Sequence, residues 1–188
     1  MITQEALLYG DVMFRLHDKV VYPGHGVAKI QRVVKKDIAG REAAFYELVF
    51  LNKDMTILVP VANAETVGLR ALSSHEHILG VFSYLTEIPE QTMPTECAPA
   101  NWSKRNKEYQ LKIKNGDLKE LCAIYRDLHA LSNQKELSFG EKTLLHQIEA
   151  LLVEEISLVE KVAEDKTIEH LRSLCAGLCD KEFESSGY

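Results

Sequence analysis

The sequence lacks the features of several protein classes. It contains no run of about 18 apolar residues, the minimum for a transmembrane helix, and its N-terminus lacks the basic-then-apolar pattern of a secretory signal. These absences predict a cytosolic protein without a membrane partner. The four cysteines include no C-x-x-C pair, so we expect reduced thiols rather than disulfides; they are Cys97, Cys122, Cys175 and Cys179.

Catalytic motifs are also missing. The sequence has no G-x-S-x-G elbow, no H-E-x-x-H zinc motif, no phosphate-binding G-x-x-x-x-G-K loop and no dinucleotide-binding G-x-G-x-x-G. His75 and His77 lack nearby partners for a metal ion, which predicts surface histidines. Cys175 and Cys179 lie among leucines, which favours packing over ligand binding. We therefore expect a protein that is not an enzyme and holds no cofactor or metal.

The composition is that of a folded, acidic protein. Hydrophobic residues make up 46% of the chain, and the net charge is −6. An acidic protein can bind nucleic acid only through a local basic patch. One such patch exists at 101–119, where six lysine and arginine side chains stand against two carboxylates.

The first third of the chain is typical of an antiparallel β-structure. Short segments rich in β-branched and aromatic residues alternate with turn residues, such as Gly24-His25-Gly26, which we interpret as a plain β-turn. The segment at 44–51 is expected to be core, whereas the shorter 55–59, which Pro60 terminates, is the better candidate for an edge strand. The predicted strands cover residues 19–22, 27–36, 44–51 and 55–59.

The rest of the chain is typical of helices. Ser73 with Glu76 predicts a capping box for a helix reaching about residue 85, and residues 86–100, which contain three prolines, predict an extended linker. Asn101 is the expected cap of the next helix, which should end at Asn115-Gly116. Asp117 with Glu120 should begin a third helix.

Two more helices complete the pattern. Ser138 with Glu141 forms another capping box, followed by a long helix with one apolar face. Adjacent Glu154 and Glu155 point in different directions on such a helix and are interpreted as solvated. A last helix is expected at 166–179.

Strands followed by helices indicate two separate domains. The sequence therefore predicts an α+β protein with a small antiparallel β-barrel or sheet at 1–72 and an all-α domain at 73–188.

Trp102 is the only tryptophan, and it begins the basic segment. Periodicity alone favours a core residue that anchors its helix. The alternative is a wedge, because apolar side chains beside cations can enter a distorted DNA minor groove while the cations bind phosphates. Lys142, in the first turn of the long helix, could join those cations.

Both halves of the sequence contain motifs of one known family. Residues 18–26 (DKVVYPGHG) and the later Val59-Pro60-Val61 resemble the N-terminal domain of the CarD/CdnL family, a domain that transcription-repair coupling factors share. The segments NWSKR at 101–105, GDL at 116–118, RDL at 126–128 and LSFGEK at 137–142 resemble that family's helical domain. The resemblance covers about residues 13–165.

The resemblance implies a bacterial transcription regulator that acts in the cytoplasm, at the nucleoid, as a monomer. Its Tudor-like N-terminal domain would bind the β subunit of RNA polymerase, with Lys36, Met55, Ile57 and Leu58 as contacts chosen by position. Its helical domain would bind promoter DNA at the upstream edge of the bubble, in the minor groove, and stabilise the open complex. The DNA contacts would be the wedge Trp102 and the cations Lys104, Arg105, Lys107 and Lys142.

Two positions depart from the family's pattern: Leu58 replaces a basic or polar residue of some relatives, and Asn106 replaces an aromatic. A second function therefore stays open. The chain could be an interaction module that binds polymerase or another partner without touching DNA, which its acidic net charge favours.

Overall fold

The computed structural model describes residues 13–38, 40–87 and 102–185, with side chains described as far as residue 176. The expected Asn101 cap, the linker residues 88–100, Cys97 and the side chain of Cys179 lie outside this part. The chain forms two compact units, Met1–Leu72 and Ser73–Tyr188. In the residues described, the first unit contains an antiparallel sheet and the second five helices, so the predicted α+β class is confirmed.

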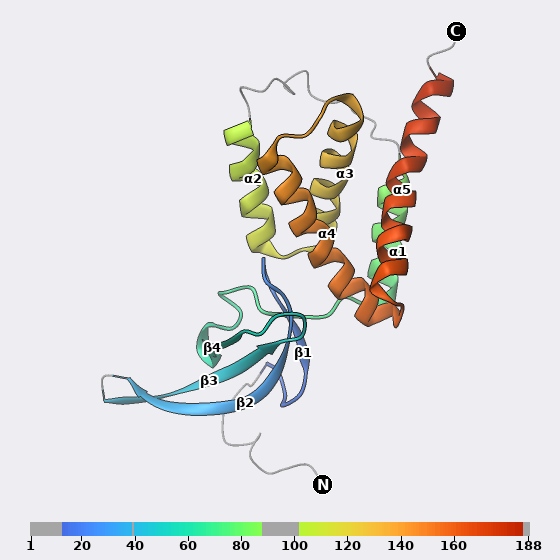
Figure 1. Cartoon of the computed structure of the whole chain (residues 1–188). Helices are drawn as coiled ribbons and strands as arrows, with labels where there is room; N and C mark the ends of the chain where they lie inside the picture. Colours follow the sequence, from blue (N-terminus) through green and yellow to red (C-terminus); the bar gives the residue numbers. More distant parts are fainter. Residues whose placement is uncertain (1–12, 39, 88–101, 186–188) are drawn as a thin grey trace. The chain divides into compact units, whose positions relative to one another are not determined.

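The sheet of the first unit has five strands in the order β4-β3-β2-β1-β5. β2 and β3 form a long curved hairpin that extends beyond β4 (Figure 1). A register shift between Ile30 and Arg32 marks a bulge in β2, which bends a strand and increases its twist. The strands are β1 (Lys19–Tyr22), β2 (Gly26–Ile38), β3 (Arg41–Phe50), β4 (Thr56–Pro60) and β5 (Arg70–Ala71).

One face of this sheet carries the core of the first unit. Side chains of a strand alternate between two faces, and Tyr46 and Leu48 of β3, together with Ile30 of β2, are fully buried in one apolar cluster. Val61–Asn63 forms a short 3-10 helix after β4, and Val61 packs against the same cluster. The side chains between them in sequence, such as Glu47, lie on the opposite face.

The four predicted strands are confirmed within two or three residues, but β5 was missed. It has only two residues, and Val20 and Val21 pair with it. A two-residue strand leaves no periodicity in the sequence, because pairing with β1 alone defines it. The Gly24 turn is confirmed: Gly24 has a φ of 73°, a conformation that favours glycine, and the His25 N–H donates to the Tyr22 carbonyl at 3.0 Å.

The described residues of the second unit form five helices, three of which begin with a side-chain cap. Asp117 and Ser138 accept backbone N–H groups three residues ahead, as predicted, and the full capping box of Ser138 with Glu141 is present. Gly116, with a φ of 70°, follows α2 as expected. The helices are α1 (His75–Thr86), α2 (Trp102–Asn115), α3 (Leu118–Gln134), α4 (Phe139–Glu160) and α5 (Glu164–Ser185).

One predicted cap is wrong by one residue, and the last helix was predicted too short. The cap of α1 is Ser74, whose hydroxyl accepts the His77 N–H. Ser73 instead donates its backbone N–H to Glu155 at 2.9 Å. Ser73 thus contacts α4, and Ser74 caps α1.

The interpretation of Glu154 and Glu155 as solvated is also wrong. Their exposed fractions are 6% and 2%, because α4 contacts α1, α3 and α5 and is covered on most of its circumference. Leu152 and Ile156 of the predicted apolar face are confirmed as core. The hydrogen bond from the Ser73 N–H offsets part of the cost of burying the Glu155 carboxylate, because a buried polar group needs a partner.

A second carboxylate network holds α5 against the bundle. Glu149 of α4 accepts two hydrogen bonds from Arg172 of α5, at 2.8 and 2.7 Å, and one from the Tyr125 hydroxyl of α3 at 2.9 Å. The Arg172 guanidinium lowers the pKa of Glu149, and burial opposes that shift. The carboxylate therefore links three helices while ionised.

The remaining predictions for this unit concern thiols, histidines and membranes. Cys122 and Cys175 are buried free thiols, and burial raises the pKa of Cys122. His75 is exposed, as predicted, with Nδ1 at 2.8 Å from Glu160. The described residues contain no group of three or more His, Cys, Asp or Glu side chains that could hold a metal ion. No helix in the described part of the chain is long and apolar enough to cross a membrane.

Candidate nucleic-acid interface

Trp102 is the first residue of α2, and its indole ring is partly buried. It packs against the main apolar cluster of the helical unit. Tyr109 and Ile113, seven and eleven residues later, lie on the same face of the helix and are buried in that cluster. One side of the Trp102 ring therefore packs against the core and the other side is exposed. The ring can anchor its helix and still contact a partner molecule.

Gly140, in the first turn of α4, supports the ring from the neighbouring helix. A Cβ placed on Gly140 would lie 3.3 Å from Trp102 Cζ2 and 3.5 Å from its Nε1. The shorter of these distances is tight for a methyl group, so an alanine here would displace the ring by a few tenths of an ångström. The glycine therefore allows α2 and α4 to approach at this point.

Glu141, 1% exposed, ties the beginnings of the two helices together. Its carboxylate accepts Arg105 Nη2 at 2.9 Å and both the N–H and the hydroxyl of Ser138 at 2.9 Å. Lys135 Nζ adds a longer contact of 3.4 Å. Burial opposes ionisation, but the Ser138 and Lys135 hydrogen bonds outweigh it and lower the pKa of Glu141.

The predicted DNA-contacting cations differ in their availability. Lys104 and Lys107 are exposed on α2, and neither forms an ion pair with the described part of the chain. Arg105 is half-buried and paired with Glu141, with its Cζ 6.0 Å from the Trp102 ring centroid. Lys142 is exposed and paired with exposed Glu136 at 2.8 Å, a contact of little net stability. The structure thus places Trp102, Lys104, Arg105 and Lys142 in the first turns of α2 and α4 and Lys107 in the second turn of α2, with Arg105 committed to a carboxylate.

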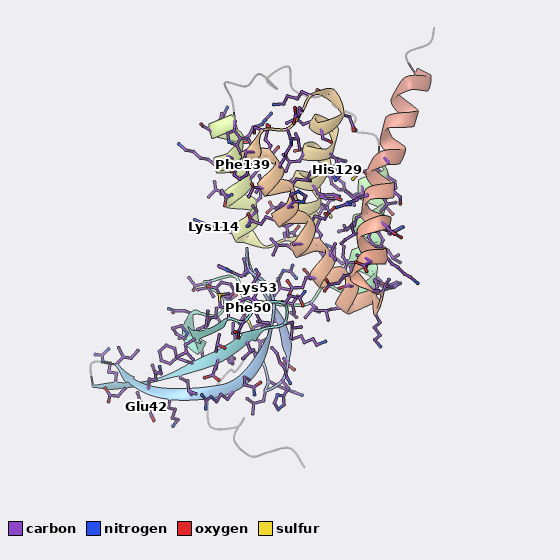
Figure 2. The ribbon with its side chains drawn as sticks, viewed as in Figure 1. Glu42, Phe50, Lys53, Lys114, His129 and Phe139 are labelled. Carbon is purple, nitrogen blue, oxygen red and sulfur yellow. The ribbon has the colours of Figure 1, made fainter. Side chains whose placement is uncertain are left out.

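No sequence pattern pointed to Phe139 as a functional residue. It is the first residue of α4 and is 87% exposed, the most exposed large apolar side chain among those described. Figure 2 labels it at the N-terminal end of α4. The local sequence carries no signal for this exposure, because Leu118 also follows a helix cap and is fully buried.

Replacing Gly140 by alanine is expected to move the Trp102 ring. The fluorescence emission of the free protein should shift, since Trp102 is the only tryptophan, and binding to a DNA bubble should weaken severalfold. Gly80→Ala is the matched control, because Gly80 also lies in a helix but has nothing within 4 Å of its Cβ position. That control should leave emission unchanged and stabilise the protein by about 0.5–1 kcal/mol. Identical emission spectra for the two variants would contradict the close contact.

The predicted polymerase contacts fall on two different faces of the sheet. β4 stands at one end of the strand order, as expected of an edge strand. Leu58 is 38% exposed and pairs with Glu47, which pairs in turn with Arg32. Lys36, four residues after Arg32, has the same orientation.

Met55 and Ile57 instead pack against the core cluster of the first unit. The structure therefore brings Lys36 and Leu58 to one exposed face, which also carries the Arg32–Glu47 ion pair of 2.9 Å. Met55 and Ile57 stabilise the strand from the other side.

Comparison with known proteins supports the resemblance in both halves. The model of the CarD-like/TRCF RID domain matches residues 14–73, and that of the CarD C-terminal domain matches residues 81–172. A protein named "Putative transcription factor YdeB", from Bacillus subtilis (strain 168), is 24% identical over 155 residues, which are 81% of this chain and 95% of the relative. Because the two domains occur in this order and together span most of the chain, the protein belongs to the CarD/CdnL family of transcription-associated regulators.

Proposed function

We propose that this protein binds the β subunit of RNA polymerase through its sheet and promoter DNA through the first turns of α2 and α4. The DNA contact lies at the upstream edge of the transcription bubble, in the minor groove. Its result is a longer-lived open complex.

The observation that carries this proposal is the setting of Trp102. Its ring is anchored by the helical core and by Gly140, and the first two turns of α2 and the first turn of α4 also carry exposed Lys104, Lys107 and Lys142. An anchored ring costs little conformational entropy when it inserts. The lysines supply phosphate contacts that are independent of sequence. Arg105 contributes by fixing the helix that carries the ring.

The physical mechanism needs no catalytic group. A ring that fits only a distorted groove binds open DNA better than closed DNA, and such a difference in affinity shifts the equilibrium between them. A preference of about 1.4 kcal/mol shifts it about tenfold. The direct test measures the lifetime of polymerase–promoter open complexes with and without the protein, on a promoter with an unstable bubble. An unchanged lifetime, with the protein bound to polymerase, would contradict the proposal.

A second candidate function is an interaction module that never touches DNA. The net charge of −6 and the pairing of Arg105 and Lys142 with glutamates favour it. Salt dependence separates the two, because DNA binding through lysines weakens steeply as salt rises. Binding of a DNA bubble that is weak and insensitive to salt would support the interaction module.

Leu58→Glu is expected to weaken binding to the polymerase β subunit by about tenfold or more, the effect of losing about 1.4 kcal/mol at an interface. An exposed edge strand can pair with a strand of the partner, and the new carboxylate, opposite Glu47, would lose its hydration there. Val67→Glu is the control, since Val67 is a comparably exposed apolar residue outside β4. Binding should be measured by calorimetry with the isolated β-subunit domain; equal affinities of the two variants would place the contact elsewhere.

A further inference from the structure

We propose that Phe139 is a second DNA-inserting side chain, so that the protein presents two aromatic rings, Trp102 and Phe139, to the minor groove of opened promoter DNA. This inference rests on the proposed function and adds a residue to its DNA contact. The first observation is exposure: a phenylalanine ring that is 87% exposed contributes little to folding. Its apolar surface becomes useful when something covers it.

The backbone under Phe139 is fixed, so the exposed ring stands on a rigid base. The Ser138 cap precedes it, and the Thr143 hydroxyl donates to the Phe139 carbonyl at 2.9 Å. The Cβ position of the next residue, Gly140, lies 3.3 Å from the Trp102 ring. Since consecutive Cα atoms are about 3.8 Å apart, the Phe139 Cα lies within about 9 Å of that ring. The two rings therefore belong to one surface, formed by the adjoining first turns of α2 and α4.

The charge beside the ring identifies the partner as DNA. Lys142 is three residues after Phe139, on the same face of α4, and its side chain is half-exposed. Its pairing with Glu136 is exposed on both sides, so a phosphate can replace the carboxylate at little cost. Lys104 and Lys107 are exposed on α2, the helix that Trp102 begins. An apolar wedge flanked by cations is the combination that intrudes at distorted minor-groove steps.

The test compares Phe139→Ala, Phe139→Leu and Leu79→Ala in full polymerase–promoter complexes. Leu79 is an exposed apolar residue of α1 in the same unit, and it serves as the control. The promoter carries 2-aminopurine at the upstream edge of the bubble, whose fluorescence reports unstacking. We expect Phe139→Ala to shorten the open-complex lifetime about threefold to fivefold and to lower the fluorescence. The Phe139→Leu variant should keep part of the protein's effect on the open-complex lifetime. The Leu79→Ala variant should keep all of it.

Trp102→Ala, measured in parallel, separates failure of this inference from failure of the proposed function. If Trp102→Ala shortens the lifetime and Phe139→Ala does not, the second wedge is wrong and the proposed function stands. If neither variant matters, the proposed function fails, and the inference fails with it. A marked fall in the melting temperature of free Phe139→Ala would show that the ring packs within the chain. Weaker binding to polymerase without DNA would show a protein contact; either result would overturn the inference.

Discussion

Trp102→Ala is expected to abolish most of the protein's effect on open-complex lifetime, a loss of about tenfold, while binding to the polymerase is retained. A tenfold loss corresponds to about 1.4 kcal/mol of preference for open over closed DNA. The ring is the largest apolar group at the first turn of α2, and alanine leaves nothing that can enter a widened base step. The measurement is the decay of open complexes after addition of a competitor, with the wild-type protein, the variant or neither.

The variant needs controls for folding, because Trp102 also packs against the helical core. Truncation of a partly buried ring costs some stability, so the melting temperature should be measured with the lifetime. Trp102→Phe keeps an aromatic ring and should recover a large part of the lifetime. A folded Trp102→Ala variant that extends the lifetime as fully as the wild-type protein would exclude the wedge and favour the interaction module.

Glu141→Ala is expected to have the largest effect on stability, about 3 kcal/mol, the low end of the cost of removing one partner from a buried ion pair. The carboxylate is 1% exposed and holds Arg105, Lys135 and both polar groups of Ser138. Its loss leaves the half-buried Arg105 guanidinium without its anion and removes the capping box of α4. Urea unfolding followed by far-UV circular dichroism, which reports on the helical domain, measures the change.

Glu136→Ala is the matched control for Glu141→Ala. Glu136 also pairs with a lysine, but both side chains are exposed, so its removal should change stability by less than about 0.5 kcal/mol. Equal effects of the two substitutions would contradict the role assigned to burial.

The pH dependence of the Glu141 contribution gives an independent check. Because the folded-state pKa of Glu141 is lowered, its stabilisation is fully present above the unfolded value of about 4.3. It is lost as the pH falls through the folded pKa. The difference in stability between wild type and Glu141→Ala should therefore shrink below about pH 4. A difference independent of pH over this range would show that the carboxylate charge is not what stabilises the helix ends.

The sequence alone determined the class and much of the order of elements. Turn residues and β-branched segments predicted four strands, and the Asp117 and Ser138 caps predicted where two helices begin, because caps and turns are local hydrogen-bond patterns. Gly116 likewise marked the end of α2. Family motifs in both halves indicated the CarD/CdnL family, which the domain matches confirm. The positions of Trp102 and Lys142 in the chain did not show by themselves that these residues share a surface.

Tertiary structure decided the features that depend on which elements meet. The adjacent positions of Glu154 and Glu155 predicted a solvated pair. Both are buried, because α4 is enclosed by α1, α3 and α5. Ser74 rather than Ser73 caps α1, while the Ser73 N–H bonds to Glu155 on a distant helix. Arg105 became an internal ion-pair partner rather than a free cation because Glu141 faces it from another helix.

The same reason explains why the predicted polymerase contacts split into two groups. Met55, Ile57 and Leu58 are neighbours in sequence, but side chains of a strand alternate between faces, and the position of the core decides which face is exposed. The contact between Gly140 and Trp102 brings together residues 38 positions apart. Local sequence fixes capping, turns and periodicity; burial, pairing of charges and shared surfaces are relations between distant segments, which exist only once the chain has folded.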